Sequence, residues 1–113
     1  MATPRALTVS ERAVLDFILD QEWEGAEQVR SMLRQTRASP GCGCGCGSLD
    51  LTVVGPGEPL RSPSPVPAEA TAFFDGHPFT ALLFVDEDGA YLEFVWYGEP
   101  AERLPRPDEL GPA

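Results

Sequence analysis

Three cysteines are the residues of this chain whose type and spacing best suit chemistry. Cys42, Cys44 and Cys46 alternate with glycines between residues 41 and 47, and the chain has no other cysteine. In a flat strand, residues two apart point to the same side about 6.6 Å from each other, so the sulfurs would form a row. Two thiolates on one zinc ion must come within ~4.6 Å of each other. The run must therefore bend to chelate a metal, and its glycines permit such a bend.

Three thiolates suit zinc or copper(I), with His77, an acidic side chain or water as the fourth ligand. Metal motifs of strong specificity carry paired Cys-x-x-Cys spacings, and this chain has none. Free cysteine also behaves as a small buried hydrophobe, so the same run fits a strip of close packing. We favour packing without a cofactor. A zinc or copper site at Cys42, Cys44 and Cys46 is the alternative, and a reactive thiol comes third.

Other chemistries find less support in the sequence. Residues 86–89 (Asp-Glu-Asp-Gly) resemble part of a calcium loop, but an EF-hand needs a glutamate where Val95 stands. The glycine-rich run leads into a predicted strand rather than a helix, which disfavours a phosphate-binding loop. A cysteine nucleophile would need His77, the only histidine, to lie beside the run. We therefore favour a role that is not enzymatic.

The charge of the chain restricts its partners. Eight arginines, no lysine and 18 acidic residues give a net charge of -10, which disfavours nucleic acids and anionic membranes as partners. No apolar stretch approaches the ~20 residues that span a bilayer, and the N-terminus lacks the features of a signal peptide. We expect a cytoplasmic bacterial protein whose thiols stay reduced.

The N-terminal third of the chain is predicted to be helical. A capping box at Thr8 and Glu11 precedes apolar residues at helical spacing. A break near Gly25 separates them from a second helical stripe that begins at Ala26, and the helical pattern continues to residue 36. These features predict a helical hairpin over residues 8–36.

Alternating apolar residues predict a strand over residues 48–54, and apolar segments next to turn signals predict strands over 70–74, 79–85 and 90–97. The turn signal before residue 79 is Asp-Gly-His-Pro at 75–78. We expect one α+β domain over residues 1–113, with the N-terminal helical hairpin packed on a three- to four-stranded, mainly antiparallel sheet. Residues 55–67 contain five prolines and two glycines, which predicts a flexible surface loop. The tail over residues 98–113 contains four prolines and is expected to wander over the surface or fray.

The last two predicted strands are apolar on both sides, which is typical of a sheet covered on two faces. The helices cover one face, so the proline-rich loop or a second subunit must cover part of the other. We therefore expect a homodimer or another protein partner, with Tyr91, Trp96 and Tyr97 as anchors, because aromatic residues dominate interface energies. The sequence favours a small cytoplasmic binding or interaction module. A thiolate metal-binding protein is the alternative.

Three segments of the chain together resemble a group of small uncharacterised actinobacterial proteins that share a domain of unknown function. They are Trp-Glu-Gly-Ala-Glu-Gln-Val-Arg at 23–30, Cys-Gly-Cys-Gly-Cys-Gly-Ser-Leu-Asp-Leu at 42–51, and Leu-Glu-Phe-Val-Trp-Tyr at 92–97. The resemblance covers nearly the whole chain and implies a compact domain in which the cysteine run is a family feature. Members often have proline where this chain has Gly47. The resemblance implies no activity.

Overall fold

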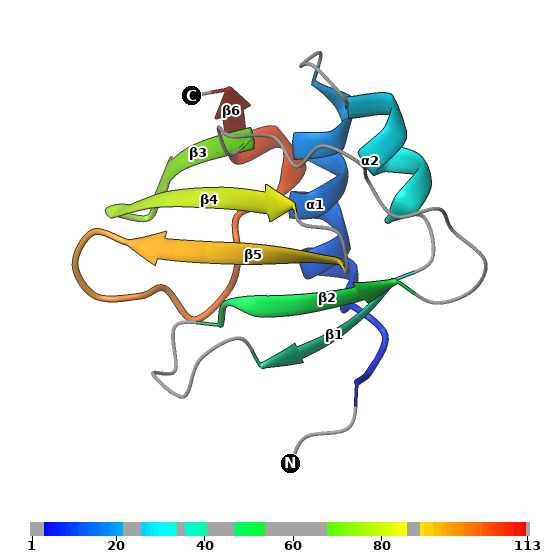
Figure 1. The fold of residues 1–113 in the computed structure, drawn as a ribbon. Coiled ribbons are helices and arrows are strands. Elements are labelled where there is room, and N and C mark those ends of the chain that lie inside the picture. The colour runs from blue at the N-terminus through cyan, green and yellow to red at the C-terminus, as the bar shows by residue number, and fades with distance from the viewer. Residues whose placement is uncertain are drawn as a thin grey trace.

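The structure, a computed structural model, describes residues 4–21, 26–33, 36–40, 47–53, 68–85 and 89–112. In these ranges it has two α-helices and one antiparallel sheet of six strands in the order β1-β2-β5-β4-β3-β6 (Figure 1). The elements are α1 (Val9–Asp20), α2 (Ala26–Met32), β1 (Thr36–Pro40), β2 (Leu49–Val53), β3 (Ala68–Phe74), β4 (His77–Val85), β5 (Gly89–Trp96), the 3-10 helix η1 (Pro107–Glu109) and β6 (Leu110–Pro112).

The predicted α+β class is confirmed, but the predicted strand count is wrong, because the sheet has six strands rather than three or four. Both additional strands are edge strands. β1 begins at Thr36, the last residue of the predicted helical hairpin, and continues through residues 37–40, for which no element was predicted. It pairs with β2. β6 lies in the tail that was expected to wander or fray, and it pairs with β3. The four predicted strands are present, with ends shifted by one or two residues.

The start of α1 follows the predicted capping box. The Thr8 hydroxyl accepts a hydrogen bond from the Glu11 amide (3.1 Å), and the Glu11 carboxylate accepts one from the Thr8 amide (2.9 Å). The Arg5 guanidinium adds two bonds to the same carboxylate, at 2.7 and 2.9 Å. The backbone of Arg5 also exchanges hydrogen bonds with Ala38 of β1. The helix start is thereby fixed to the edge of the sheet.

The second helical segment begins at Ala26, as predicted, and buries Ala26, Val29 and Leu33. The Arg30 guanidinium donates two hydrogen bonds, at 2.9 and 2.6 Å, to the Leu19 carbonyl in the last turn of α1. This contact supplies a cation and a donor where the helix leaves carbonyls unpaired. The two helices contact each other, while residues 22–25 between them lie outside the described residues.

The turn predicted over residues 75–78 is present between β3 and β4, but it occupies only residues 75 and 76, and residues 77 and 78 belong to β4. Phe74 and His77 are register partners, and the two residues between them have positive φ angles, 50° at Asp75 and 80° at Gly76. A two-residue hairpin of this kind needs left-handed backbone at both positions, which glycine and aspartate tolerate. The turn sequence therefore sets the register of β3 on β4.

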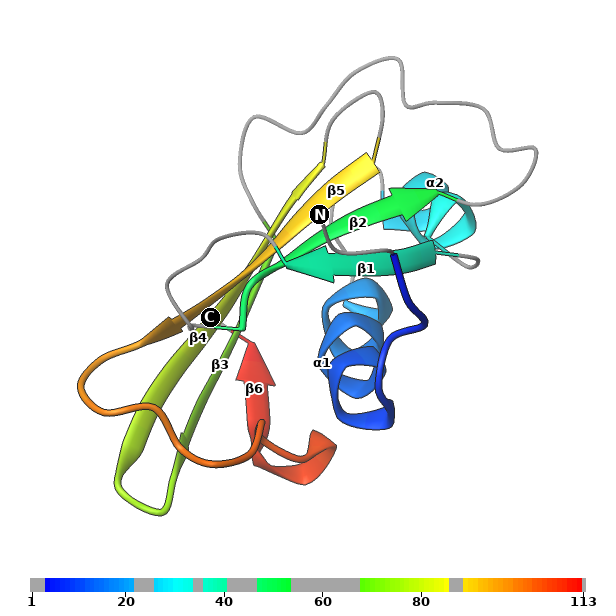
Figure 2. The ribbon, with the colours of Figure 1, turned by 90° about the horizontal axis from the view of Figure 1, so that it is seen from below.

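The hydrophobic core lies between the helices and one face of the sheet (Figure 2). Its largest fully buried side chains are Phe79, Leu15, Ile18, Leu19, Leu33, Leu83, Leu92, Val14 and Pro105. On β4 the burial alternates, so that Leu83 is 1% exposed while its neighbour Phe84 is 41% exposed. Described residues thus cover one face of the sheet, whereas cover on both faces was expected. The proline-rich segment 55–67, one of the expected covers, lies outside the described residues.

Candidate functional site on the open face of the sheet

The cysteine run lies outside the described residues, which resume at Gly47. The flanking residues Pro40 and Leu49 are register partners on β1 and β2. The run therefore belongs to the connection of an antiparallel pair. In the described part of the chain, no three His, Cys, Asp or Glu residues lie close enough together to hold a metal ion. The packing strip and the thiolate site both stay predictions.

His77, the proposed fourth metal ligand, lies at the start of β4. Its Nδ1 atom is 2.8 Å from the Glu99 carbonyl oxygen, and because a carbonyl only accepts, Nδ1 carries the proton. The imidazole also meets Trp96 edge-on, with ring centroids 6.4 Å apart, and Phe74 at 6.2 Å. These contacts attach the beginning of the C-terminal tail to the hairpin, which is a structural role.

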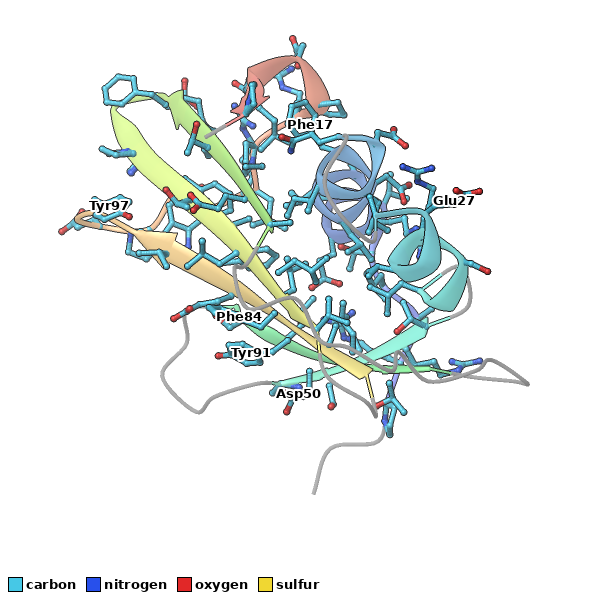
Figure 3. All side chains as sticks on the ribbon, turned by 45° about the horizontal axis from the view of Figure 1, so that its top comes forward. Phe17, Glu27, Asp50, Phe84, Tyr91 and Tyr97 are labelled. Carbon is cyan, nitrogen blue, oxygen red and sulfur yellow. The ribbon has the colours of Figure 1, made fainter. Side chains whose placement is uncertain are left out.

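The side of the sheet away from α1 is here termed the open face. Side chains alternate across a strand, so the residues between the core positions of β3, β4 and β5 point to this face. In Figure 3, Asp50, Phe84, Tyr91 and Tyr97 all project away from the helices. The open face includes Glu69, Thr71 and Phe73 of β3, Pro78, Thr80, Leu82 and Phe84 of β4, Tyr91, Glu93 and Val95 of β5, Tyr97, Asp50 and Thr52 of β2, and Arg37 and Ser39 of β1.

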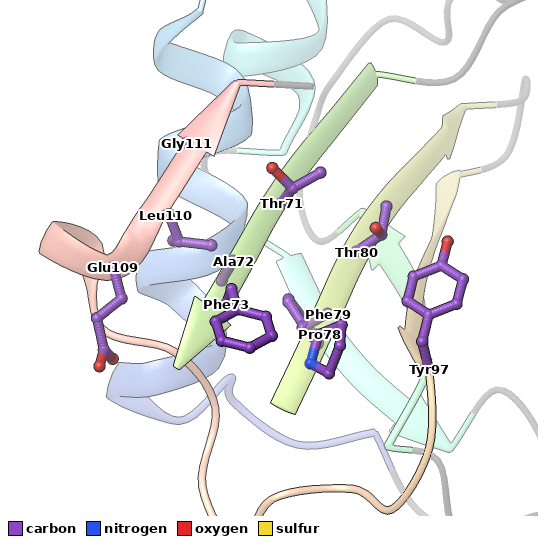
Figure 4. A pocket seen from close by; sticks show the side chains of 10 residues that line it. All are labelled: Thr71, Ala72, Phe73, Pro78, Phe79, Thr80, Tyr97, Glu109, Leu110 and Gly111. Carbon is purple, nitrogen blue, oxygen red and sulfur yellow. The ribbon is translucent and has the colours of Figure 1, made fainter. Parts of the chain in front are cut away.

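An aromatic groove forms at one end of the open face. Phe73 and Pro78 are register partners, and the Tyr97 amide donates to the Pro78 carbonyl (3.2 Å). The side chains of Phe73 and Tyr97 are 73% and 61% exposed. The shallow cavity along them has a volume of about 460 Å³, and Thr71 and Thr80 continue its lining toward the middle of the sheet (Figure 4). Rigid aromatic side chains beside a proline form a surface suited to apolar contact.

The three residues predicted as interaction anchors divide between the two faces. Tyr97 lies in the aromatic groove, and Tyr91 lies on the open face with its ring 6.4 Å from that of Phe84. Trp96 points to the core side, where its ring centroid is 4.6 Å from that of Phe79. Neighbours in a strand cannot share a face, so strand periodicity alone separates Trp96 from Tyr97.

Two exposed aromatic residues of the open face were missed by the sequence prediction, namely Phe73 and Phe84. Both lie in strands that were predicted, and both alternate with buried residues. The signal that identifies them is the register of the hairpin. With Phe79 assigned to the core, its neighbours Pro78 and Thr80 point outward, and Phe73 lies opposite Pro78.

Carboxylates occupy the middle of the open face. Leu82 is the register partner of Glu69 on one side and of Glu93 on the other, and these three residues are here termed the acidic row. Asp50 lies farther along the same face, opposite Tyr91. Within the described part of the chain, the carboxylates of Glu69, Glu93 and Asp50 take part in no ion pair.

The carboxylates on the core side and at the tail are engaged by arginines. Hydrogen bonds from Arg5, and secondarily from Thr8, hold the pKa of Glu11 below its ordinary value of 4.5. Arg103 binds Glu109 through two bonds of 2.7 and 2.9 Å. Together with the amide of Arg106, it lowers the pKa of Glu109 to about 2. These carboxylates are paired for structural purposes.

Arg103 also connects the tail to the β3–β4 turn. Its guanidinium lies 4.6 Å from the centre of the Phe74 ring and 3.3 Å from the Asp75 carboxylate. A cation over an aromatic face is attracted by the ring quadrupole. Beyond this contact, Pro105 and Leu110 are buried and β6 pairs with β3. The tail is thereby held against the sheet.

Comparison with protein-family models, with curated proteins and with solved structures finds no match for this chain. Of the helices in the described ranges, none combines the length and the apolar character needed to cross a membrane.

Proposed function

We propose that this chain is a small cytoplasmic binding module without catalytic activity, and that a protein partner docks on the open face. The observation that carries the proposal is the exposure of Phe73 and Tyr97 on either side of Pro78. Contiguous exposed apolar patches on soluble proteins mark interaction sites more often than scattered single residues do. Phe84 and Tyr91 extend the aromatic surface toward the other end of the sheet.

The limited flexibility of these aromatic side chains supports the same proposal. Tyr and Phe lose little conformational entropy on binding, because they have only two side-chain torsions. Here they project from antiparallel strands whose other face is packed against the core. The strands place the aromatic groups rigidly, so a partner does not have to order the surface that it contacts.

Photocrosslinking in cells tests whether a partner occupies the open face. With p-benzoylphenylalanine in place of Phe73, we expect one or a few discrete crosslinked products. The matched control places the same group at Val9, which is 88% exposed on α1. In a chain that also carries Tyr97→Ser, the yield of the Phe73 product should fall several-fold. Equal crosslinking at the two positions would contradict the proposal.

A thiolate metal-binding protein is the alternative function. It is supported by the three alternating cysteines and by the register pair Pro40 and Leu49, which brings the chain back into the sheet directly after the run. If the alternative is correct, protein purified without chelator should contain stoichiometric zinc or copper(I). The variant with Cys42, Cys44 and Cys46 all changed to serine should contain none. A metal-free wild type would remove this alternative and leave the binding proposal standing.

A further inference from the structure

We propose that the partner of the open face is a basic protein segment with apolar flanks, in which one arginine or lysine lies over Leu82 between Glu69 and Glu93. This inference rests on the proposed function and assigns a chemistry to the partner. It is carried by the arrangement of charge on the open face.

The acidic row has the dimensions of a cation site. Glu69, Leu82 and Glu93 stand opposite one another on three neighbouring strands. Strands in a sheet lie about 4.8 Å apart, so the two glutamates are about 10 Å apart with the leucine midway. A guanidinium or ammonium group over Leu82 would lie within about 5 Å of both carboxylates. Its aliphatic stem would cover the leucine side chain.

The charges of the acidic row are available to such a group. Elsewhere in the described ranges, Glu11 and Glu109 each bind an arginine through paired hydrogen bonds. Neither Glu69 nor Glu93 takes part in an ion pair with a described residue. Among described residues, the nearest cation on the open face is Arg37, on edge strand β1. It is three strands away from Leu82, which leaves the row free of a described counter-charge.

Apolar groups lie on both sides of the acidic row. The row of Phe84 and Tyr91 lies two residues along the strands in one direction, and Asp50 stands beside Tyr91. The aromatic groove with Phe73 and Tyr97 lies four residues away in the other direction. At about 3.4 Å per residue, these distances are about 7 and 14 Å. An extended segment with a basic residue between apolar residues matches this order.

The same charges disfavour a second copy of this chain as the occupant. The chain has a net charge of -10, and two open faces placed against each other would bring Glu69, Glu93 and Asp50 of both copies together. Like charges across an interface reduce both affinity and the rate of association. A basic partner gains from the same field, because it is steered toward the acidic surface.

Selection from a random dodecapeptide phage library tests this inference. The targets are the immobilised wild-type chain, the double variant Glu69→Gln/Glu93→Gln, and the control Glu27→Gln/Glu102→Gln. The control removes the same charge from two exposed positions outside the strands of the sheet, Glu27 on α2 (Figure 3) and Glu102 in the tail. We expect wild type and control to enrich peptides with arginine or lysine between apolar residues. A synthesised peptide from this selection should bind the Glu69/Glu93 variant about five- to tenfold more weakly.

Each outcome of the selection separates this inference from the proposed function. The proposal of a basic partner segment would be wrong if the enriched peptides lack a basic residue. It would also be wrong if the selected peptide binds wild type and the Glu69→Gln/Glu93→Gln variant with equal affinity. Either result would leave the open face as a binding site. If wild type sediments as a dimer and the Phe73→Ser variant sediments as a monomer, the occupant of the open face is a second copy of the chain and not a basic segment. If wild type enriches no peptide beyond a Phe73→Ser/Tyr97→Ser target and Phe73 also fails to crosslink, both proposals are wrong.

Discussion

Over residues 81–85 of β4, the two faces of the sheet carry similar apolar residues but have different surroundings. On β4, Phe79, Ala81, Leu83 and Val85 point to the helices and are at most 7% exposed. Between them Leu82 and Phe84 point to the open face, where Phe84 is 41% exposed. Both sets are apolar, so composition alone does not separate them. The comparison teaches that burial in this sheet depends on which side α1 and α2 pack.

The carboxylates show the same contrast as the apolar residues. Glu11, at the start of α1, is 8% exposed and is bound by Arg5 and by the Thr8 amide. Glu93, on the open face, has no ion pair with a described residue. A carboxylate removed from water needs partners. A carboxylate on an accessible face, without an ion pair inside the described chain, can pair with a cation of another molecule. The proposed basic partner is based on this difference.

The largest expected effect separates two neighbouring leucines. Leu83→Ala should lower the free energy of unfolding by about 3 kcal/mol, because it removes buried methyl groups and leaves a cavity in the core. Leu82→Ala, one residue along the same strand, should cost less than about 1 kcal/mol, because this side chain is only partly buried. Urea denaturation of both variants gives the comparison. Both substitutions replace leucine by alanine in the middle of β4, so their change in β propensity is the same. A similar loss of unfolding free energy in both variants would show that the open face is covered.

A smaller effect is expected from two glutamates. Glu11→Gln should cost about 1 to 2 kcal/mol at pH 7, because it weakens the bonds to Arg5 and to the helix cap. Glu93→Gln, without a described ion pair, should change stability by less than about 0.5 kcal/mol. The measurement is chemical denaturation at pH 7 and at lower pH.

The pH dependence of the Glu11 effect has a definite sign. The folded pKa of Glu11 is below 4.5 because of the hydrogen bonds from Arg5. The stabilisation is therefore complete above about pH 4.5 and is lost as the pH falls through the lower folded value. The difference between wild type and Glu11→Gln should shrink at acidic pH, while the Glu93→Gln difference should stay small throughout. If the difference in unfolding free energy between wild type and Glu11→Gln stays constant down to pH 2, the ion pair of Glu11 with Arg5 is contradicted.

Much of the sheet was predictable from local patterns. Alternating apolar residues located β2, and apolar segments next to turn signals located β3, β4 and β5. The turn sequence around Gly76 located the hairpin between β3 and β4. β1 and β6 were missed because they are short edge strands whose pairing depends on residues distant in the sequence. In β1, for example, only Ala38 is buried, opposite Leu51. A single buried alanine carries too little periodicity to identify a strand.

The candidate site was predictable only in part. Tyr91 and Tyr97 were predicted and lie on the open face, while Trp96 is partly buried and packs against the core beside Phe79. Phe73 was missed, although it is among the most exposed large hydrophobic residues in the described ranges. The acidic row was also missed, because Glu69 and Glu93 are 24 residues apart in the sequence. Only the register of three strands places them around Leu82.

The sequence by itself determined the features that depend on neighbouring residues. These are the capping box of Thr8 and Glu11, the alternation of apolar residues along β2, and the turn at Asp75 and Gly76. The tertiary structure decided which side of each strand is covered, how the tail binds through Arg103, and which carboxylates stay unpaired among described residues. The physical reason is that helical and strand preferences act over a few residues. Burial and ion pairing arise between segments that only the fold brings together.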